Sequence, residues 1–260
     1  MTRHRQRWWL AGVALWTLVP IAALVVRALA RAWRYPQILP GAGDAWPMFG
    51  AAATGRLTEA LMTSLVLAMA IGPASAVIGF TIGRAIARGP RPARRVGLAL
   101  ALFLVIAPPT ALGVGLQVAT LAIGVGGTLF GVFLAHLVPA AGYLTLFAVG
   151  IFTTFDFVLE EEARTLGARP WQVWSRITIP ILRRRLAEAV VLGALVSWGQ
   201  VALTLLIGGG VVRTLPVELL SFVRSGSDQL GALAALAVSV PPMLAIGLLQ
   251  VGIRRTGATL

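Results

Sequence analysis

Apolar residues in this chain fall in long blocks, and short polar segments rich in arginine separate them. A bilayer core needs about 20 consecutive, mostly apolar residues for each helix that crosses it. No segment shows the alternating polarity of a barrel strand, so the blocks are expected to be helices. The pattern predicts an all-α membrane protein with a single transmembrane domain over residues 1–260. Its six predicted spans are Trp8–Ala30, Leu57–Ile82, Val96–Leu116, Leu129–Phe152, Leu186–Ile207 and Leu230–Val251.

Composition agrees with a chain whose main solvent is lipid. Apolar residues make up 58% of the sequence and charged residues only 12%, against roughly a quarter charged in soluble domains. The absence of cysteine excludes disulfides, thiolate metal sites and cysteine nucleophiles. His4 and His136 are the only histidines, so neither a metal site nor a cofactor is predicted. Pro108-Pro109 and Pro139 are candidate kinks in the third and fourth spans.

The distribution of arginine predicts the orientation in the membrane. Sixteen arginines lie before the first span, after the sixth, or in the loops between spans two and three and spans four and five; six lie on the other side. An excess of basic residues marks cytoplasmic loops, so both termini are predicted to be cytoplasmic. Because these arginines occupy loops and not one soluble face, nucleic acid is not an expected partner.

The N-terminal segment has a second interpretation. Arg3 to Arg7, an apolar run and Ala28-Leu29-Ala30 together resemble a cleavable signal peptide. The run of about 19 residues is long for such a segment, and Arg27 lies close to the cleavage position. We therefore interpret it as a span, and the loop after span four would be cytoplasmic in either case.

Two longer external loops are predicted, at Arg31–Arg56 and Gly208–Gln229. The first is rich in proline and glycine and contains Trp33, Tyr35 and Trp46. These aromatic residues favour a belt at the membrane interface. A docking surface for an external partner is the alternative.

The cytoplasmic loop at residues 153–182 is too polar to span a membrane, yet it is strongly patterned. Apolar residues at helical spacing predict one short amphipathic helix: Phe155, Leu159, Ala163 and Leu166. Gly167 is suited to the left-handed conformation that ends a helix. Pro170 is suited to the first turn of a second helix.

The second helix is predicted to place Trp171, Trp174 and Ile177 on one face and to end at Pro180. A projecting apolar patch of this kind indicates a partner surface. It is equally typical of a hairpin that lies on the membrane with its arginines toward anionic lipid. Physical chemistry alone leaves both interpretations open.

The loop resembles the signature of permease subunits of ABC importers: E-A-A, three residues, G, nine residues, I, one residue, L-P. Five residues match it in register: Glu161, Ala163, Gly167, Ile177 and Pro180. Glu162 replaces the first Ala and Ile179 replaces Leu. The resemblance extends to further short segments: Tyr35-Pro36, Leu39-Pro40, Pro108-Pro109, Leu134 to Leu137, Leu203 to Gly210 and Thr214-Leu215-Pro216.

The resemblance implies a bacterial cytoplasmic (inner) membrane protein in which residues 155–180 form a coupling helix. Its implied partners are two copies of a cytoplasmic ATPase, a second permease subunit, an external or periplasmic substrate-binding protein, and membrane lipid. The resemblance favours a different chain as the second permease subunit, and a second copy of this chain is the alternative. The implied cargo is a polyamine, thiamine, a phosphonate, ferric iron or sulfate. The chain has no lysine, which a phosphate-binding P-loop requires. ATP hydrolysis is therefore expected in a partner subunit.

Polar residues inside the spans are the candidates for a substrate path. Span five contains Ser197, Gln200 and Thr204 within two turns, and buried polar groups face either an interior path or a neighbouring helix. Both roles stay open for these three residues. His136 is interpreted as a packing or helix-bridging residue.

The sequence fits a permease better than it fits two other classes of membrane protein, secondary transporters and membrane enzymes. A secondary transporter would be expected to carry ionisable groups near the membrane midplane, whereas every acidic residue here lies in a loop or near a span end. A membrane enzyme would need a nucleophile, base and acid together, or a set of metal ligands. The sequence shows neither.

Overall fold

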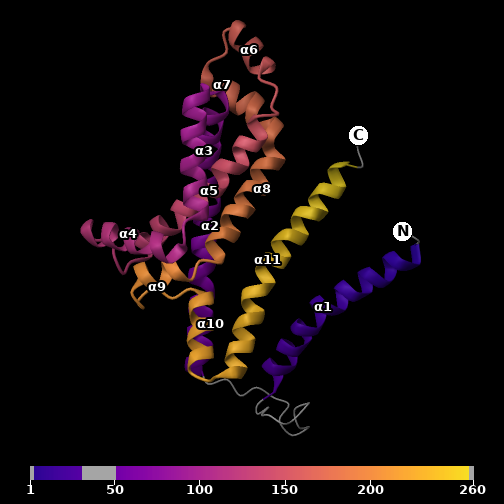
Figure 1. The fold of residues 1–260 in the computed structure, drawn as a ribbon, viewed down its shortest axis with the longest axis vertical. Coiled ribbons are helices and arrows are strands. Elements are labelled where there is room, and N and C mark those ends of the chain that lie inside the picture. The colour runs from indigo at the N-terminus through magenta and orange to yellow at the C-terminus, as the bar shows by residue number, and fades with distance from the viewer. Residues whose placement is uncertain (1–2, 31–50, 258–260) are drawn as a thin grey trace. The chain divides into compact units, whose positions relative to one another are not determined.

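The computed structural model describes residues 3–30 and 51–257, and within these ranges every regular element is helical. In chain order (Figure 1) they are α1 (Arg3–Leu29), α2 (Ala51–Arg88), α3 (Arg91–Ile106), α4 (Pro109–Ala122), α5 (Leu129–Phe152), α6 (Val158–Thr165), α7 (Pro170–Val173), the π-helical turn η2 (Trp174–Thr178), α8 (Ile179–Trp198), α9 (Ala202–Gly208), α10 (Leu215–Arg224) and α11 (Asp228–Gly257). Most of the first predicted external loop lies outside the described residues. So do the predictions for Trp33, Trp46, Tyr35-Pro36 and Leu39-Pro40.

The chain divides into two compact units. One consists of Met1–Met62 with Arg213–Leu244, and the other of Thr63–Val212 with Ala245–Leu260. In the first unit Arg27 is paired with Asp228 at 2.6 Å and Arg56 with the buried Glu218 at 3.5 Å. The second unit contains the signature loop and the polar residues of span five.

Three helices in the described residues are long and apolar enough to cross a membrane unaided: Ala53–Arg88, Leu129–Phe152 and Asp228–Gly247. Two bent pairs add to these, namely α3 with α4 at 100° and Pro170–Trp198 with α9 at 64°. The described apolar part of α1, Leu15–Leu29, is shorter. Five of the six predicted spans are thus present as helices or bent pairs, and six spans remains a prediction.

The predicted third and fifth spans are not single straight helices. The first break follows from the proline pair, because Ala107 and Pro108 each precede a proline and adopt extended backbone with ψ of 131° and 128°. The second break lies at Gly199–Val201, between α8 and α9. Pro139, also a candidate kink, lies inside an uninterrupted α5. The external segment Gly208–Gln229, predicted as a loop, contains the helix α10.

Small residues bring α2 close to its neighbours in the second unit. A Cβ added at Gly79 would lie 2.6 Å from the backbone carbonyl carbon of Leu144 in α5, and one at Gly83 would lie 2.6 Å from the Cβ of Ala148. Two turns before Gly79, a Cβ at Gly72 would lie 2.6 Å from the backbone oxygen of Val190 in α8. These glycines allow backbones to approach where lipid supplies no hydrophobic drive between helices.

Candidate functional site

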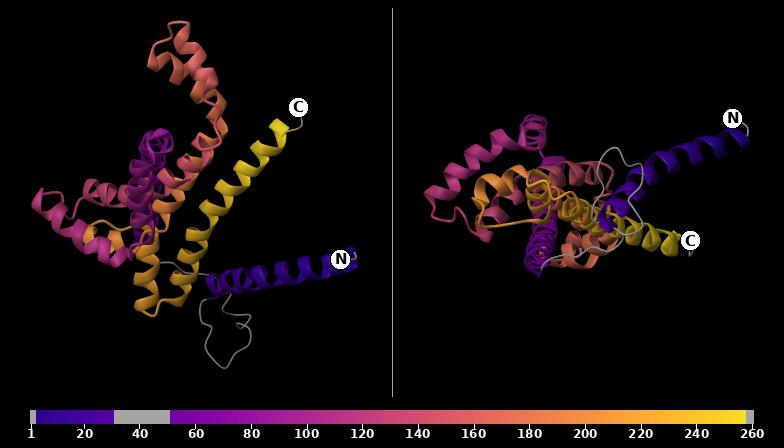
Figure 2. Two further views of the ribbon diagram at one scale, coloured as in Figure 1. Left: turned by 45° about the horizontal axis from the view of Figure 1, so that its top comes forward. Right: turned by 90° about the horizontal axis from the view of Figure 1, so that it is seen from below.

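The loop after α5 forms a helical hairpin that projects from the end of α8 (Figure 2). We call residues 155–180 the coupling hairpin, after the role that the sequence resemblance implies for them. Its first arm, α6, ends at Thr165 with Leu166 as the C-cap, and Gly167 follows with a φ of +86°, a left-handed conformation that favours glycine. The amide of Ala168 then donates to the carbonyl of Ala163 at 3.0 Å, which closes the turn. Pro170 begins the second arm, as predicted from its position.

The tip of the hairpin exposes apolar side chains. Leu166 is 88% exposed and Trp171 is 59% exposed, on either side of the turn at Gly167. Glu161, the first residue of the signature, also faces outward and lies 3.5 Å from Arg88. Large apolar residues exposed at a projecting tip are typical of a surface that contacts another molecule.

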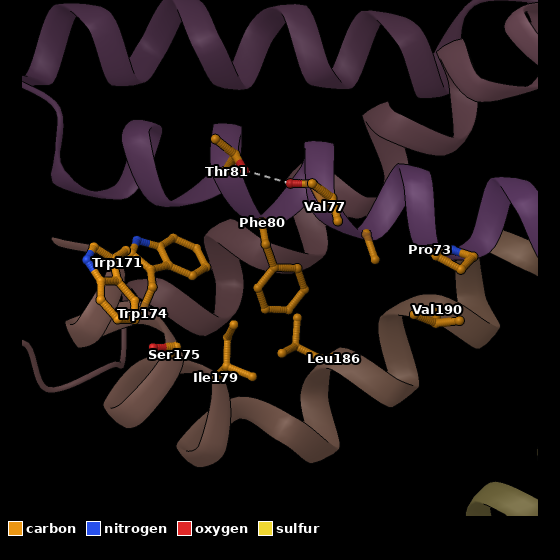
Figure 3. Close-up of a pocket in the computed structure, with 11 residues that line it drawn as sticks. Pro73, Val77, Phe80, Thr81, Trp171, Trp174, Ser175, Ile179, Leu186 and Val190 are labelled. Atoms are coloured by element: carbon orange, nitrogen blue, oxygen red, sulfur yellow. Dashed lines mark hydrogen bonds between the residues drawn. The ribbon is translucent and has the colours of Figure 1, made fainter.

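The second arm borders an apolar groove of about 790 Å³ between α2 and α8 (Figure 3). Trp171 and Trp174 lie at one end of it, and the ring of Phe80 lies between α2 and Leu186. Ile177, predicted on the same face as the two tryptophans, is half-buried and is not among the lining residues. The sequence therefore predicted correctly that Trp171 and Trp174 share one face of the second arm, but it wrongly placed Ile177 on that face.

Pro180 does not end the second arm, contrary to the sequence prediction. The helix continues from Pro170 through Trp198. The π-helical turn at Trp174–Thr178 widens the helix just before the proline, where the ring would otherwise clash with the carbonyl of Arg176. The hairpin and α8 consequently share one continuous helix.

A buried ion pair lies beneath the exposed tip, and sequence reasoning did not find it. Glu160, the residue before the signature, is fully buried and accepts two hydrogen bonds from the guanidinium of Arg84 at the end of α2. The hydroxyl of Thr178 in η2 donates to the same carboxylate at 2.6 Å. Paired geometry of this kind gives the strongest class of protein hydrogen bond.

The surroundings determine the charge of Glu160. Burial by itself raises the pKa of the carboxyl, but hydrogen bonds from Arg84 and Thr178 and the charges of Arg84 and Arg88 outweigh burial and hold the pKa below its ordinary value. Because the folded pKa lies below the unfolded one, this group stabilises the fold above its unfolded pKa. That stabilising contribution is lost as the pH falls through the folded pKa. Because the pKa is lowered, Glu160 is charged at neutral pH.

A second polar cluster joins the broken helix to α5. The two ring nitrogens of His136 lie 3.1 Å from the Ser197 hydroxyl and 2.9 Å from the Thr204 hydroxyl. All three side chains are buried, whereas Gln200, in the break between α8 and α9, is only partly buried. Bonds to His136 favour the helix-bridging role for Ser197 and Thr204, and they leave Gln200 as the member of the predicted path most open to another molecule.

We expect Gln200→Leu to lower substrate uptake several-fold while the yield and thermal midpoint of the purified protein stay at the wild-type level. Ser197→Ala is the matched variant. It should instead cost about 0.6–1.7 kcal/mol of stability, the value of one interhelical hydrogen bond in a membrane, with uptake little changed. Uptake and thermal unfolding of both variants are the measurements. Wild-type uptake by Gln200→Leu would assign all of span five to packing.

Comparison with known proteins shows the family of the chain. Residues 75–256 match the family described as binding-protein-dependent transport system inner membrane component. The chain belongs to that family. It is an ABC importer permease, a multi-pass component of the inner membrane, and the sequence-based prediction of the family is confirmed.

Curated permeases of several transport systems are similar to this one over most of its length. The molybdenum transport system permease ModB of Mycobacterium tuberculosis is 30% identical over 221 residues, covering 78% of this chain and 83% of ModB. The putative 2-aminoethylphosphonate permease PhnV of Salmonella typhimurium is 26% identical, with 82% and 80% covered. The sulfate permease CysW of Synechocystis is 25% identical, with 81% and 82% covered.

The fold of this permease also matches a solved structure. A bacterial ABC transporter involved in the import of alginate superposes with a TM-score of 0.65 at 14% identity and covers 96% of both chains. The match confirms the predicted all-α permease fold.

Proposed function

We propose that this permease forms half of a substrate path across the membrane and takes up energy from a cytoplasmic ATPase through the coupling hairpin. The observation that carries the proposal is the hairpin tip, where Leu166 and Trp171 are exposed around the left-handed turn at Gly167. In a permease that imports with a binding protein, an apolar tip of this kind supports ATPase docking over contact with lipid. The predicted coupling residues are Glu161, Ala163, Leu166, Gly167, Pro170, Trp171, Trp174, Ile177 and Pro180.

The partners follow from the same proposal. Two copies of an ATPase subunit hydrolyse ATP, since this chain contains no lysine for a P-loop. A second permease subunit, a different chain, supplies the other half of the path, and an external binding protein delivers the substrate. The excess of arginine in the hairpin and in the α2–α3 segment supports an orientation with both termini in the cytoplasm.

We further propose that the cargo is a small oxyanion. Three related permeases belong to systems for molybdenum, 2-aminoethylphosphonate and sulfate. Molybdenum dissolved in neutral water is the molybdate dianion, so the three cargoes share a tetrahedral group of negatively charged oxygens. Polyamine, thiamine and ferric iron, which the sequence also left open, lack this shared chemistry.

Co-purification in mild detergent from native membranes tests the proposal. We expect an ATPase subunit, a second permease and a binding protein to be recovered with the tagged chain and identified by mass spectrometry. Molybdate, sulfate or 2-aminoethylphosphonate should stimulate the ATPase activity of the complex with its binding protein, and spermidine or thiamine should not. Recovery of the chain without an ATPase subunit would contradict the coupling role, and stimulation by spermidine or thiamine alone would contradict the oxyanion class.

A further inference from the structure

The buried carboxylate of Glu160 joins parts of the second unit that are far apart in sequence. It lies in the first turn of α6, and its partners Arg84 and Thr178 come from α2 and η2. Arg88, one turn after Arg84, places a second guanidinium 3.6 Å from the same carboxylate. In the described part of the chain, Glu160 is the carboxylate that pairs with Arg84.

Aromatic rings enclose the arginine side of this cluster. The Arg84 guanidinium carbon lies 5.2 Å from the ring centres of Phe157 and Trp174 and 5.8 Å from that of Phe152. Arg88 lies 4.7 Å from the ring centre of Phe157. Cation–π contacts are stronger where the cation has lost water, and here the Arg84 side chain is only 11% exposed. The cluster therefore fixes the orientation of α6, η2 and the end of α2 relative to one another.

Helix α2 is linked to the hairpin through this cluster of side chains, whereas α5 and α8 are linked to it through the backbone. The hairpin follows α5 and runs directly into α8, so the backbone itself moves those two helices with it. Helix α2 has no such connection, and its Arg84 end reaches the hairpin through side chains. Glu160 is the group on α6 that bonds to it most fully, because the Glu161 contact is exposed and spans 3.5 Å.

We propose that Glu160 is a positioning residue that fastens the coupling hairpin to the Arg84 end of α2, so that α2 moves together with the hairpin. This inference rests on the proposed function, in which an ATPase displaces the hairpin tip. Leu166 at the tip receives the displacement, and Glu160, two turns earlier on α6, passes it to α2. A buried pair suits this task, since removing one partner leaves an uncompensated charge and the pair resists separation.

Substitution on either side of the pair tests the inference. Glu160→Gln keeps the shape of the side chain but removes the charge, and Arg84→Lys keeps the charge but removes the two-point geometry. The double variant Arg84→Gln with Glu160→Gln leaves no buried charge. Glu188→Gln is the matched control, because in the described residues Glu188 forms its ion pairs with Arg184 and Arg185 of its own helix α8.

The first readout is the amount of substrate transported for each ATP hydrolysed by the purified complex. We expect this ratio to fall by about tenfold or more in Glu160→Gln and by less in Arg84→Lys, while ATPase retention and hydrolysis continue. The double variant should regain part of the ratio, and Glu188→Gln should keep the wild-type ratio. A wild-type ratio in both Glu160→Gln and Arg84→Lys would overturn the inference.

The second readout needs no ATPase. Because the chain contains no cysteine, Ala85→Cys and Arg164→Cys place two spin labels uniquely on exposed positions of α2 and α6. The distance between them should have a narrow distribution in the isolated permease and a broad one after Glu160→Gln or Arg84→Lys. An unchanged distribution would overturn the inference even if an ATPase binds. If the wild-type permease showed a narrow distance distribution but bound no ATPase, that result would contradict the proposed function and not the role of Glu160.

Discussion

Gly167→Trp is expected to abolish retention of the ATPase subunit and to reduce uptake to background, while the permease still inserts in the membrane. Gly167 has a φ of +86°, where a side chain costs about 1–2 kcal/mol. A Cβ at this position meets nothing within 4 Å, so the indole would extend into open space at the tip. Co-purification and uptake measurements check both parts of this result.

Gly226→Trp provides the matched control for backbone strain. Gly226 also has a positive φ, +71°, and open space around its Cβ position, but it lies in the turn between α10 and α11. This variant should retain the ATPase. If Gly167→Trp retained both the ATPase and wild-type uptake, the tip would not be the docking surface, and an amphipathic hairpin resting on lipid would become the better explanation.

Gly79→Ala is expected to lower the stability of the permease. The new Cβ would lie 2.6 Å from the backbone carbonyl carbon of Leu144, and backbone cannot move aside as a flexible side chain does. Overpacking of this kind costs about 1–3 kcal/mol. The thermal midpoint in detergent should fall, and uptake should fall with the amount of folded protein.

Gly150→Ala, in α5, is the control for the loss of stability expected in Gly79→Ala. A Cβ at Gly150 meets nothing within 4 Å, and alanine is the better helix former by about 1 kcal/mol. Its stability should equal or exceed that of wild type. A Gly79→Ala protein as stable as Gly150→Ala would show that α2 and α5 can separate slightly without loss.

The sequence predicted best the features that depend on neighbours along the chain. The predicted fourth span coincides with α5 at Leu129–Phe152. Its start is determined locally, because the Thr128 hydroxyl caps the helix by accepting a hydrogen bond from the amide of Gly131. The turn of the hairpin was predicted from Gly167 and Pro170 for similar local reasons. Local patterns also explain the wrong prediction at Pro180, because a proline usually ends a helix unless a π-helical turn precedes it.

Features that depend on distant partners could not be predicted in this way. Glu160 and Arg84 are 76 residues apart, and nothing in the run Glu160–Glu162 distinguishes the buried carboxylate from the exposed ones. Likewise, His136 binds Ser197 and Thr204 across 61 and 68 residues. Hydropathy could show that these polar residues lie in apolar spans, but only packing decides whether they face a path or each other.

The continuous helix from Pro170 to Trp198 makes the hairpin and the membrane-spanning α8 a single lever. At 1.5 Å per residue it is roughly 40 Å long, so a tilt of about 5° about one end displaces the other by about 3.5 Å. His136 bonds to residues on both sides of the break at Gly199–Val201, and α9 is therefore carried with the lever as its bent tip. A rotation of this size at the hairpin would thus shift the far end by about the width of a side chain.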